Sequence, residues 1–287
     1  MRGELRITRR SVAFRECPYI CLCLVVVVGC LTEKGISQKV SSEAKPDSLQ
    51  VARSSLDAGR PVEAEKFLRD YLVYHPASAD AHFLLGYTLF RQQRAKDSLA
   101  SFTEGAKFKR PDAANLKIVA DDYVLLGDFA DADKWLSAVT YETPGDAEAW
   151  YLLGRTKYNE NRFNEAISSF ERVLKLQPND IRAQNNLGLS YQGLGQPEKA
   201  RAAYETAIAW QKDSVLKDAQ PYLNLGNLLM EQDEAKQAQI FLERAAVLAP
   251  KNPKVHEELG RSYEELGLWN RAQHELEQAI GLAPCRC

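Results

Sequence analysis

The sequence predicts an all-α fold in which about seven helix-turn-helix repeats stack into one solenoid. Residues from Lys45 onward align in rows of 34, and only the fifth row is longer. Small residues recur at the eighth and twentieth positions of the rows, and a proline stands near the end of most of them. A fixed period of this length indicates a repeat architecture rather than two ordinary domains. The rows, numbered 1 to 7, are residues 45–78, 79–112, 113–146, 147–180, 181–218, 219–252 and 253–286.

Glycine recurs at position 8, inside the predicted first helix. Helix propensity alone disfavours glycine there, so its recurrence needs another reason. Glycine costs about 1 kcal/mol relative to alanine inside a helix. Five rows nevertheless carry it, and an alanine or serine stands twelve positions later in the second helix. We expect these small residues to face each other so that two antiparallel helices pack closely, while a large residue at position 24 fills the space beside them. The glycines are Gly86, Gly154, Gly188, Gly226 and Gly260.

The turn between the helices is predicted at position 15, where a residue with a left-handed backbone ends the first helix. Six rows have glycine, asparagine or aspartate there, namely Gly59, Gly127, Asn161, Gly195, Asp233 and Gly267. Proline then stops the second helix, because it lacks an amide hydrogen and clashes with the preceding turn. The closing prolines are Pro76, Pro111, Pro144, Pro178, Pro250 and Pro284.

Rows 1, 5 and 7 depart from the regular pattern. Row 1 has serines where larger residues are expected, which is typical of a terminal cap. Row 5 lacks the closing proline and has four extra residues near residues 210–218, added to its second helix or to the following loop. No further repeat follows row 7, so we expect its outer face to be tolerated, covered by a partner or paired in a homodimer. That face carries Leu276, Ala279 and Ile280.

These positions together resemble the tetratricopeptide repeat family over residues 45–286. The resemblance implies a right-handed superhelical solenoid whose first helices line a concave groove, chiefly through positions 2, 5, 9 and 12. In rows 3 to 6 these positions hold aromatic, arginine and amide side chains, which suit an extended peptide because they offer contact area and hydrogen bonds at modest entropic cost. The candidate groove residues are Lys117, Asp121, Tyr151, Arg155, Tyr158, Arg182, Asn185, Gln192, Asn227 and Met230.

Two asparagines at position 6, Asn186 and Asn224, resemble two steps of the asparagine ladder found in some members of the family. They extend the candidate peptide-binding set. The alternative is that the whole set is an ordinary solvated surface.

The first thirty residues predict a secretory leader. Several arginines precede an uncharged apolar segment, residues 19–31, which is shorter than the roughly 20 residues that a helix needs to cross a bilayer. Residues 27–30, Val-Val-Gly-Cys, resemble the lipobox of bacterial lipoprotein precursors. That resemblance implies a signal peptide at residues 1–29, cleavage before Cys30, lipid attachment to Cys30 and a flexible tether at residues 30–44. The alternatives are a plain secretion signal and an uncleaved N-terminal anchor.

Composition and motifs argue against catalysis and nucleic-acid binding. The 37 Lys+Arg and 39 Asp+Glu give a net charge of -2, which supplies no strongly basic face for phosphates. Phosphate-binding loops, nucleophile elbows and zinc-binding helices have no match, so we expect no enzyme activity, cofactor or metal. His82 and His256, both at position 4, are interpreted as structural, and paired acids such as Asp121 and Asp122 as solvated helix faces.

These observations predict a non-enzymatic scaffold that binds a protein or peptide segment in its groove. The resemblance to tetratricopeptide lipoproteins implies a protein of the bacterial cell envelope, attached to a membrane by lipid on Cys30, that acts during assembly of an envelope complex. The alternative is a cytoplasmic scaffold or a targeting module of a transferase or chaperone system, with an uncleaved leader.

Overall fold

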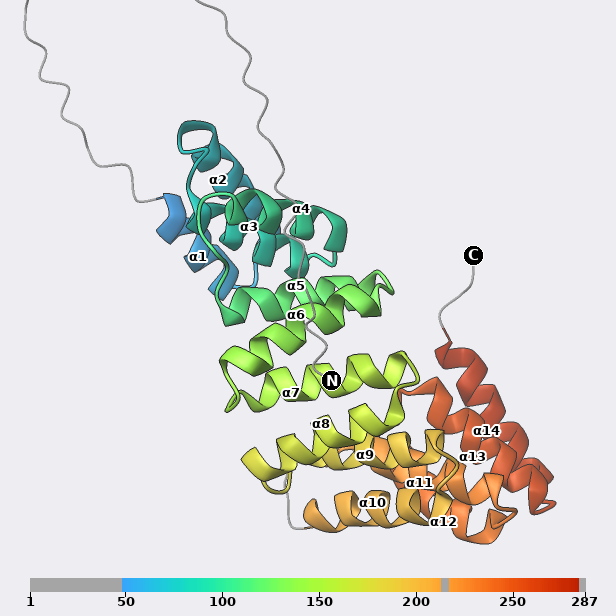
Figure 1. The fold of residues 1–287 in the computed structure, drawn as a ribbon. Coiled ribbons are helices and arrows are strands. Elements are labelled where there is room, and N and C mark those ends of the chain that lie inside the picture. The colour runs from blue at the N-terminus through green and yellow to red at the C-terminus, as the bar shows by residue number, and fades with distance from the viewer. Residues whose placement is uncertain (1–47, 213–216, 284–287) are drawn as a thin grey trace, which may run out of the picture. The chain divides into compact units, whose positions relative to one another are not determined.

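The computed structural model describes residues 48–212 and 217–283. Within these residues the chain forms fourteen α-helices and no strand (Figure 1), which confirms the all-α prediction. The helices are α1 (Ser48–Asp57), α2 (Pro61–Tyr74), α3 (Ala79–Arg91), α4 (Ala95–Ala106), α5 (Ala113–Leu125), α6 (Phe129–Glu142), α7 (Ala147–Asn159), α8 (Phe163–Leu176), α9 (Ile181–Gly193), α10 (Pro197–Trp210), α11 (Gln220–Glu231), α12 (Ala235–Leu248), α13 (Pro253–Glu265) and α14 (Trp269–Leu282).

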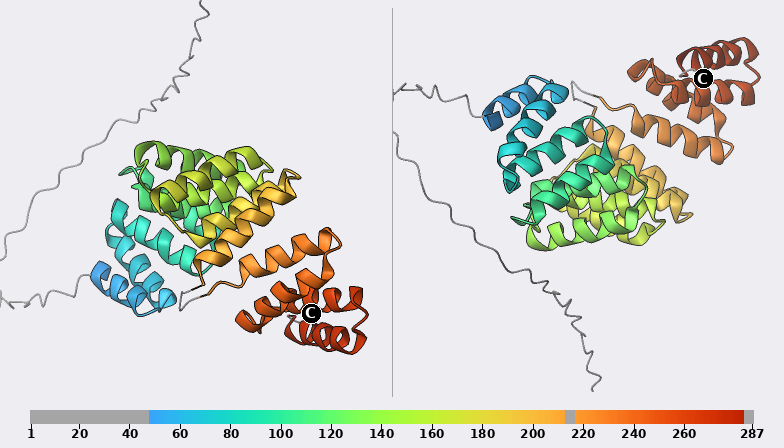
Figure 2. Two further views of the ribbon diagram at one scale, coloured as in Figure 1. Left: turned by 90° about the horizontal axis from the view of Figure 1, so that it is seen from below. Right: turned by 90° about the horizontal axis from the view of Figure 1, so that it is seen from above.

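The helices pack as consecutive pairs, one pair in each row, and each pair contacts the next. Figures 1 and 2 show the pairs following one another in chain order. The apolar clusters cross from row to row, and the largest one joins residues of rows 5, 6 and 7. The described residues therefore form a solenoid in which neighbouring repeats share their core. None of the described helices is long and apolar enough to span a bilayer.

Five of the first helices, α3, α5, α7, α9 and α13, begin at a capping side chain supplied by the end of the preceding row. Asp112, Asp146 and Asp180 each accept a hydrogen bond from the backbone N–H three residues later, and Ser78 does the same for α3. Such a side chain satisfies an amide that the helix itself leaves free. The cap recurs at position 34 of these rows, whereas α11, which follows the lengthened row 5, begins without a side-chain cap.

Packing within a pair is tighter than the sequence predicts. A Cβ atom added to Gly154 would lie 2.7 Å from Phe170 Cε1, and one added to Gly226 would lie 2.6 Å from Leu242. The large residue at position 24 thus lies directly over the glycine, where we expected it beside the contact. The small residue at position 20 also meets this glycine, since the Ser98 hydroxyl donates to the Gly86 carbonyl oxygen at 2.9 Å.

The turns have the expected left-handed residue in all seven rows. Gly59, Gly127, Gly195 and Gly267 have φ values from 67° to 77°, and Asn161 and Asp233 have 59° and 60°. Gln93 completes the set with φ of 60°, although nothing about its side chain marks a left-handed position. The geometry of the repeat imposes the turn there.

The extra residues of row 5 lie in the loop after α10. That helix has 14 residues, as α8 and α12 do, and ends at Trp210. The buried side chain of Gln211 donates from Nε2 to the Asp218 carbonyl oxygen and accepts from the Asp218 amide. One glutamine therefore closes both ends of the lengthened loop.

The last described helix, α14, exposes apolar side chains: Ile280 is 76% exposed and Trp269 is 67% exposed. Leu276 is half-buried against Gly260, so it belongs to the packing of row 7. A homodimer, one of the three alternatives for this face, stays a prediction. The leader, Cys30, the tether, Pro284 and the C-terminal cysteines lie outside the described residues.

Candidate functional site

The first helices form the inner layer of the solenoid. From α3 to α13 each first helix contacts the first helix of the next row, as well as its own partner. A side chain on this layer therefore meets neighbours from adjacent rows. Most of the predicted groove residues lie here, and they fall into two groups.

The first group surrounds Tyr151 on α7, which is 9% exposed. The Arg182 guanidinium of α9 lies 4.5 Å from the centre of its ring, within the range of a cation–π contact. Asn186 donates from Nδ2 to the Tyr151 hydroxyl at 3.2 Å. Burial raises the pKa of Tyr151 even though two arginines oppose the shift, so the phenol stays neutral and keeps its own hydrogen to donate.

Two arginines beside this ring differ in their partners. Arg182 reaches Glu148 at 3.0 Å and Asp180 at 3.4 Å. Arg155 lies 6.0 Å from the Tyr151 ring centre, is exposed, and forms no hydrogen bond or ion pair with any described residue. A guanidinium that lies near a fixed aromatic ring and forms no ion pair is available to a ligand.

The α5 members of this group are a lysine and an aspartate. Lys117 Nζ lies 2.7 Å from Asp146 Oδ2, so its charge is matched by the aspartate that caps α7. Burial raises the pKa of Asp121 to about 6, and the positive charge of Arg155 opposes that shift. Asp121 is therefore the negative neighbour of an otherwise free arginine.

The asparagines of the proposed ladder are hydrogen-bonded within the protein. Asn224 donates from Nδ2 to Asn185 Oδ1 at 2.9 Å, and its own oxygen accepts from Gln220 at the same distance. Asn186 also donates to the Arg182 carbonyl oxygen at 2.7 Å. These bonds join α9 to α11 and α7 to α9, so the amides link rows in the structure described.

The second group lies on α9 and α11. Gln192 accepts from the Tyr204 hydroxyl at 3.0 Å and donates to Glu231 Oε2 at 2.8 Å. Asn227 and Met230 line a hollow of about 620 Å³ together with residues of α12 and α13. Tyr158, the remaining predicted residue, packs edge-on against Phe163 and supports the turn between α7 and α8.

The structure corrects the interpretation of Asp122 as a solvated acid. Asp122 is fully buried, and neither carboxylate oxygen has a hydrogen-bond partner. Burial raises its pKa to about 6, although the nearby Ser98 side chain, whose hydroxyl donates to the Gly86 carbonyl oxygen, acts against that shift. Other rows place serine or threonine at this position, for example Thr156, whose hydroxyl donates to the Leu152 carbonyl oxygen. Serine and threonine at position 10 of other rows indicate that this position faces the interior.

The two histidines at position 4 have structural partners. His82 Nε2 lies 2.8 Å from the Pro76 carbonyl oxygen, and His256 Nε2 lies 3.0 Å from that of Pro250. Trp150 occupies the same position and donates to the Pro144 carbonyl oxygen. In these rows a ring at position 4 binds the closing proline of the preceding row.

Within residues 48–212 and 217–283, no cluster of histidine, aspartate and glutamate has the arrangement to hold a metal ion. The inner layer therefore offers one group with an unpaired arginine and one hollow. Glu258, Arg261 and Glu265 of that hollow are not among the predicted groove residues, because they lie at positions 6, 9 and 13 of row 7 and the predicted residues come from rows 3 to 6.

Comparison with protein families gives matches over much of the solenoid. Family models described as tetratricopeptide repeat match residues 145–213, and residues 49–114 and 185–253, which together exceed half of the chain. A solved tetratricopeptide repeat protein from Parabacteroides merdae is similar with a TM-score of 0.71 and 18% identity, over 83% of this chain and 93% of the other. YrrB, described as having an unusual peptide-binding site, has a TM-score of 0.55 and 20% identity over 65% and 90%.

Curated relatives match only in part. The human PEX5-related protein is 32% identical over 123 residues, which is 43% of this chain and 17% of the relative. The mouse protein O-mannosyl-transferase TMTC1 is 25% identical over 157 residues, or 53% of this chain and 16% of the relative. The chain thus spans about a fifth or less of the length of these curated relatives.

Proposed function

Because the chain belongs to the tetratricopeptide repeat family, we propose that it is a non-enzymatic scaffold that holds a segment of a partner protein against its first helices. One observation carries the proposal: Arg155 stands exposed and unpaired beside Tyr151, whose ring is held in place by neighbouring rows. The described residues contain no convergent nucleophile, base and oxyanion donor that would favour catalysis.

The geometry suits an extended polypeptide. Tyr151 and Arg182 give a rigid surface, because their positions are set by Asn186 and Glu148 and little side-chain entropy is left to lose on binding. Arg155 can bind a carboxylate or a main-chain carbonyl oxygen. YrrB, a protein of the same fold with a peptide-binding site, is consistent with this use of the repeats.

Site-specific crosslinking tests the proposal. A photoreactive residue at Arg155 should capture one defined protein, and Arg182→Ala should reduce that capture. The matched control is the same residue at Tyr141, which is 88% exposed on the second helix α6. Circular dichroism checks that the variants are folded. Equal capture at both positions, or capture unaffected by Arg182→Ala, would reject binding at this layer.

For location, the proposal is a lipid-anchored protein of the bacterial cell envelope, with the repeats in the periplasm or outside the cell and the partner part of an envelope complex. The support is the Val-Val-Gly-Cys sequence that ends at Cys30. Radiolabelled palmitate should be incorporated by the wild type and not by Cys30→Ala. Equal labelling, or a leader that stays attached, would exclude this anchor.

A second candidate is a cytoplasmic scaffold or targeting module with an uncleaved leader. It is favoured by the partial matches to the PEX5-related protein and to the transferase TMTC1. The same labelling experiment separates the two candidates. Retention of the leader together with recovery of the full-length protein in the cytoplasm supports the second one.

A further inference from the structure

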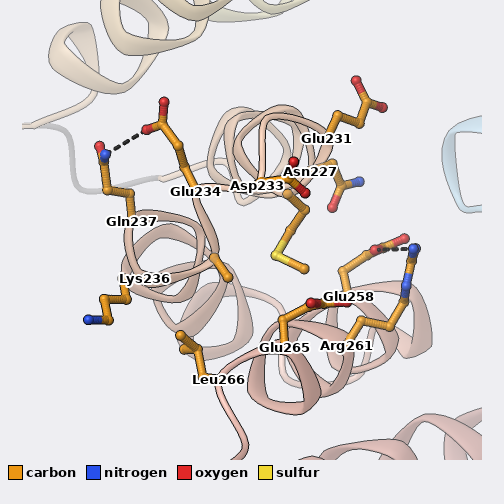
Figure 3. A pocket seen from close by; sticks show the side chains of 12 residues that line it. Asn227, Glu231, Asp233, Glu234, Lys236, Gln237, Glu258, Arg261, Glu265 and Leu266 are labelled. Carbon is orange, nitrogen blue, oxygen red and sulfur yellow. Dashed lines mark hydrogen bonds and ion pairs between the residues drawn. The ribbon is translucent and has the colours of Figure 1, made fainter.

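A hollow between rows 6 and 7 has a chemistry different from that of the Tyr151 group. It lies between α11, the start of α12 and α13, and it has a volume of about 620 Å³ (Figure 3). Met230, Ala235 and Leu266 give it an apolar part. Its rim carries five carboxylates and two basic side chains.

Three of the five carboxylates have no cationic partner. Glu258 is 5% exposed and is paired with Lys254 and Arg261. Glu234 is paired with Arg201. The others, Glu231, Asp233 and Glu265, form no ion pair within the described residues, although Glu231 accepts a hydrogen bond from an amide. In Figure 3 the Lys236 side chain points away from the space between α11 and α13, so it does not neutralise them.

A second, independent feature of the hollow is an asparagine oxygen that lacks a hydrogen-bond donor. Asn227 projects from α11 on the side of the hollow in Figure 3. Its Oδ1 atom is buried and has no hydrogen-bond partner. A buried acceptor without a donor is unfavourable until a donor reaches it. A rearrangement that admits a ligand N–H group would satisfy this oxygen.

Only one kind of protein side chain matches all of these features. Lysine and arginine combine an apolar stem with a charged head that has several N–H donors. The stem can pack on Met230 and Leu266, while the head faces Glu265. Glu231 also lines the hollow, but in Figure 3 its carboxylate points away from α13, so it acts at the edge of the hollow as a nearby charge. A phosphate, a carboxylate or a purely apolar side chain would leave the unpaired carboxylates without compensation.

We propose that the hollow between α11 and α13 binds a lysine or arginine side chain of the partner segment. The proposal rests on the proposed function for the idea that the ligand is a protein segment. Together with unpaired Arg155 in row 4, it gives the inner layer opposite charges at two places. A bound segment is therefore oriented, with its basic part at rows 6 and 7.

The test uses a labelled peptide with blocked ends and three lysines separated by alanines, and a matched peptide whose lysines are acetylated. Fluorescence anisotropy with the full chain should show binding of the first peptide, and the affinity should fall as salt rises. The double variant Glu231→Gln and Glu265→Gln should weaken binding about tenfold. Glutamine keeps the size of the side chain and its ability to accept a hydrogen bond from Gln192.

The matched control carries Glu198→Gln and Glu264→Gln, two exposed carboxylates on α10 and α13 outside the hollow. It removes the same charge and should change the affinity by less than about twofold. Equal losses in both double variants, equal binding of the acetylated peptide, or tighter binding of spermidine than of the lysine peptide would overturn the proposal.

This result is separable from that of the crosslinking at Arg155. Capture of a defined protein at Arg155 without binding of the lysine peptide would overturn the basic-residue site and leave the scaffold function standing. Binding of the lysine peptide in the hollow, lost in Glu231→Gln with Glu265→Gln, would support this site even if crosslinking at Arg155 captured nothing.

Discussion

Rows 3 and 4 each form the same kind of helix pair, but they differ in the hydrogen bonding of the buried side chain at position 10. In row 4, Thr156 is 1% exposed and donates its hydroxyl to the Leu152 carbonyl oxygen at 3.0 Å. In row 3 the same position holds Asp122, which is fully buried without a hydrogen-bond partner. An ionised carboxylate cannot donate to a helix carbonyl, so it has no way to replace the hydroxyl. The repeat period thus determines where a side chain lies, and its chemistry decides whether that place is favourable.

The contact between the two helices also differs between these rows. Row 4 places Phe170 on Gly154, where no Cβ fits. Row 3 has the combination of Ala120 and Leu136, both fully buried. A larger residue on one helix is matched by a smaller one on the other, so both rows fill their interior.

An ion-pair network connects the two rows. Lys157 of α7 is 7% exposed, and its Nζ lies 2.6 Å from Asp133 Oδ2 of α6. Arg162 approaches the same oxygen at 2.7 Å. Burial opposes ionisation, but these hydrogen bonds and charges lower the pKa of Asp133 overall. Row 3 therefore contains two different acids. Asp133 is ion-paired and joins row 3 to row 4, whereas Asp122 is buried in row 3 without a hydrogen-bond partner.

The largest expected effect on stability comes from placing an aspartate at position 10 of row 4, as row 3 has in Asp122. Thr156→Asp should lower the free energy of unfolding by about 3 kcal/mol at pH 7, because it buries a charge without a partner. Thr156→Val removes the hydroxyl without adding charge and should cost about 1 kcal/mol. Urea denaturation measures both. Equal losses would show that position 10 of row 4 tolerates a carboxylate.

The helix contact can be changed in the same way. Gly154→Ala should lower the free energy of unfolding by about 2 kcal/mol, because the new methyl group overlaps the Phe170 ring. Phe170→Leu should remove part of that loss, since the pair then matches Ala120 and Leu136. A double-mutant cycle measures the coupling. The control is Gly145→Ala, where nothing lies within 4 Å of an added Cβ, and two additive single effects would contradict the packing explanation.

The reverse change should stabilise row 3. Asp122→Thr replaces the unsatisfied carboxylate with the residue type of row 4 and should raise the free energy of unfolding by about 1.5 kcal/mol at pH 7. Asp122→Asn keeps the shape and removes the charge, and should give a smaller gain because its amide also lacks partners. A loss of stability in Asp122→Thr, measured by thermal unfolding, would mean that the carboxylate has a favourable partner.

Particular residues show how far the sequence can predict this protein. The period, the glycines over position 24 and the closing prolines were sufficient for the helix pairs, because they reflect packing that every row must repeat. Gln93 was not recognised at its turn, since its left-handed backbone is imposed by the repeat and not by its side chain. The prediction for Asp122 was wrong because position 10 faces the interior of the helix pair, whereas the pairing of two acids alone suggests a solvated helix face.

The candidate site shows a different limit. Helix position put Tyr151 and Arg182 in one candidate set, and the structure brings their side chains into contact from neighbouring first helices. It did not reveal that Lys117 would be paired with Asp146 while Arg155 stayed free. Which charged side chains form ion pairs depends on side-chain rotamers and on residues from two or three rows at once. The hollow at α13 depends on the same kind of contact.

The smallest expected effect for a single residue is the pH dependence of row 3. The raised pKa values of Asp121 and Asp122, both about 6, mean that the folded state binds protons more tightly than the unfolded state does. Stability contributed by their protonation therefore increases as pH falls from 7 through 6 towards the usual aspartate value of 3.8. Between pH 7 and pH 5 the gain should be about 1 kcal/mol for each of the two carboxyls. Asp133 has a lowered pKa, so it becomes protonated, and its ion pairs with row 4 are lost, only below the usual aspartate value of 3.8.

Hydrogen exchange of the α5 amides, corrected for intrinsic rates, measures this gain locally and separates it from the other rows. Protection of α5 should increase from pH 7 to pH 5, whereas that of α7 should not, since Thr156 does not titrate. Asp122→Thr together with Asp121→Asn should remove the increase. If α5 and α7 respond alike in the wild type, the buried acid of row 3 is not what distinguishes the two rows.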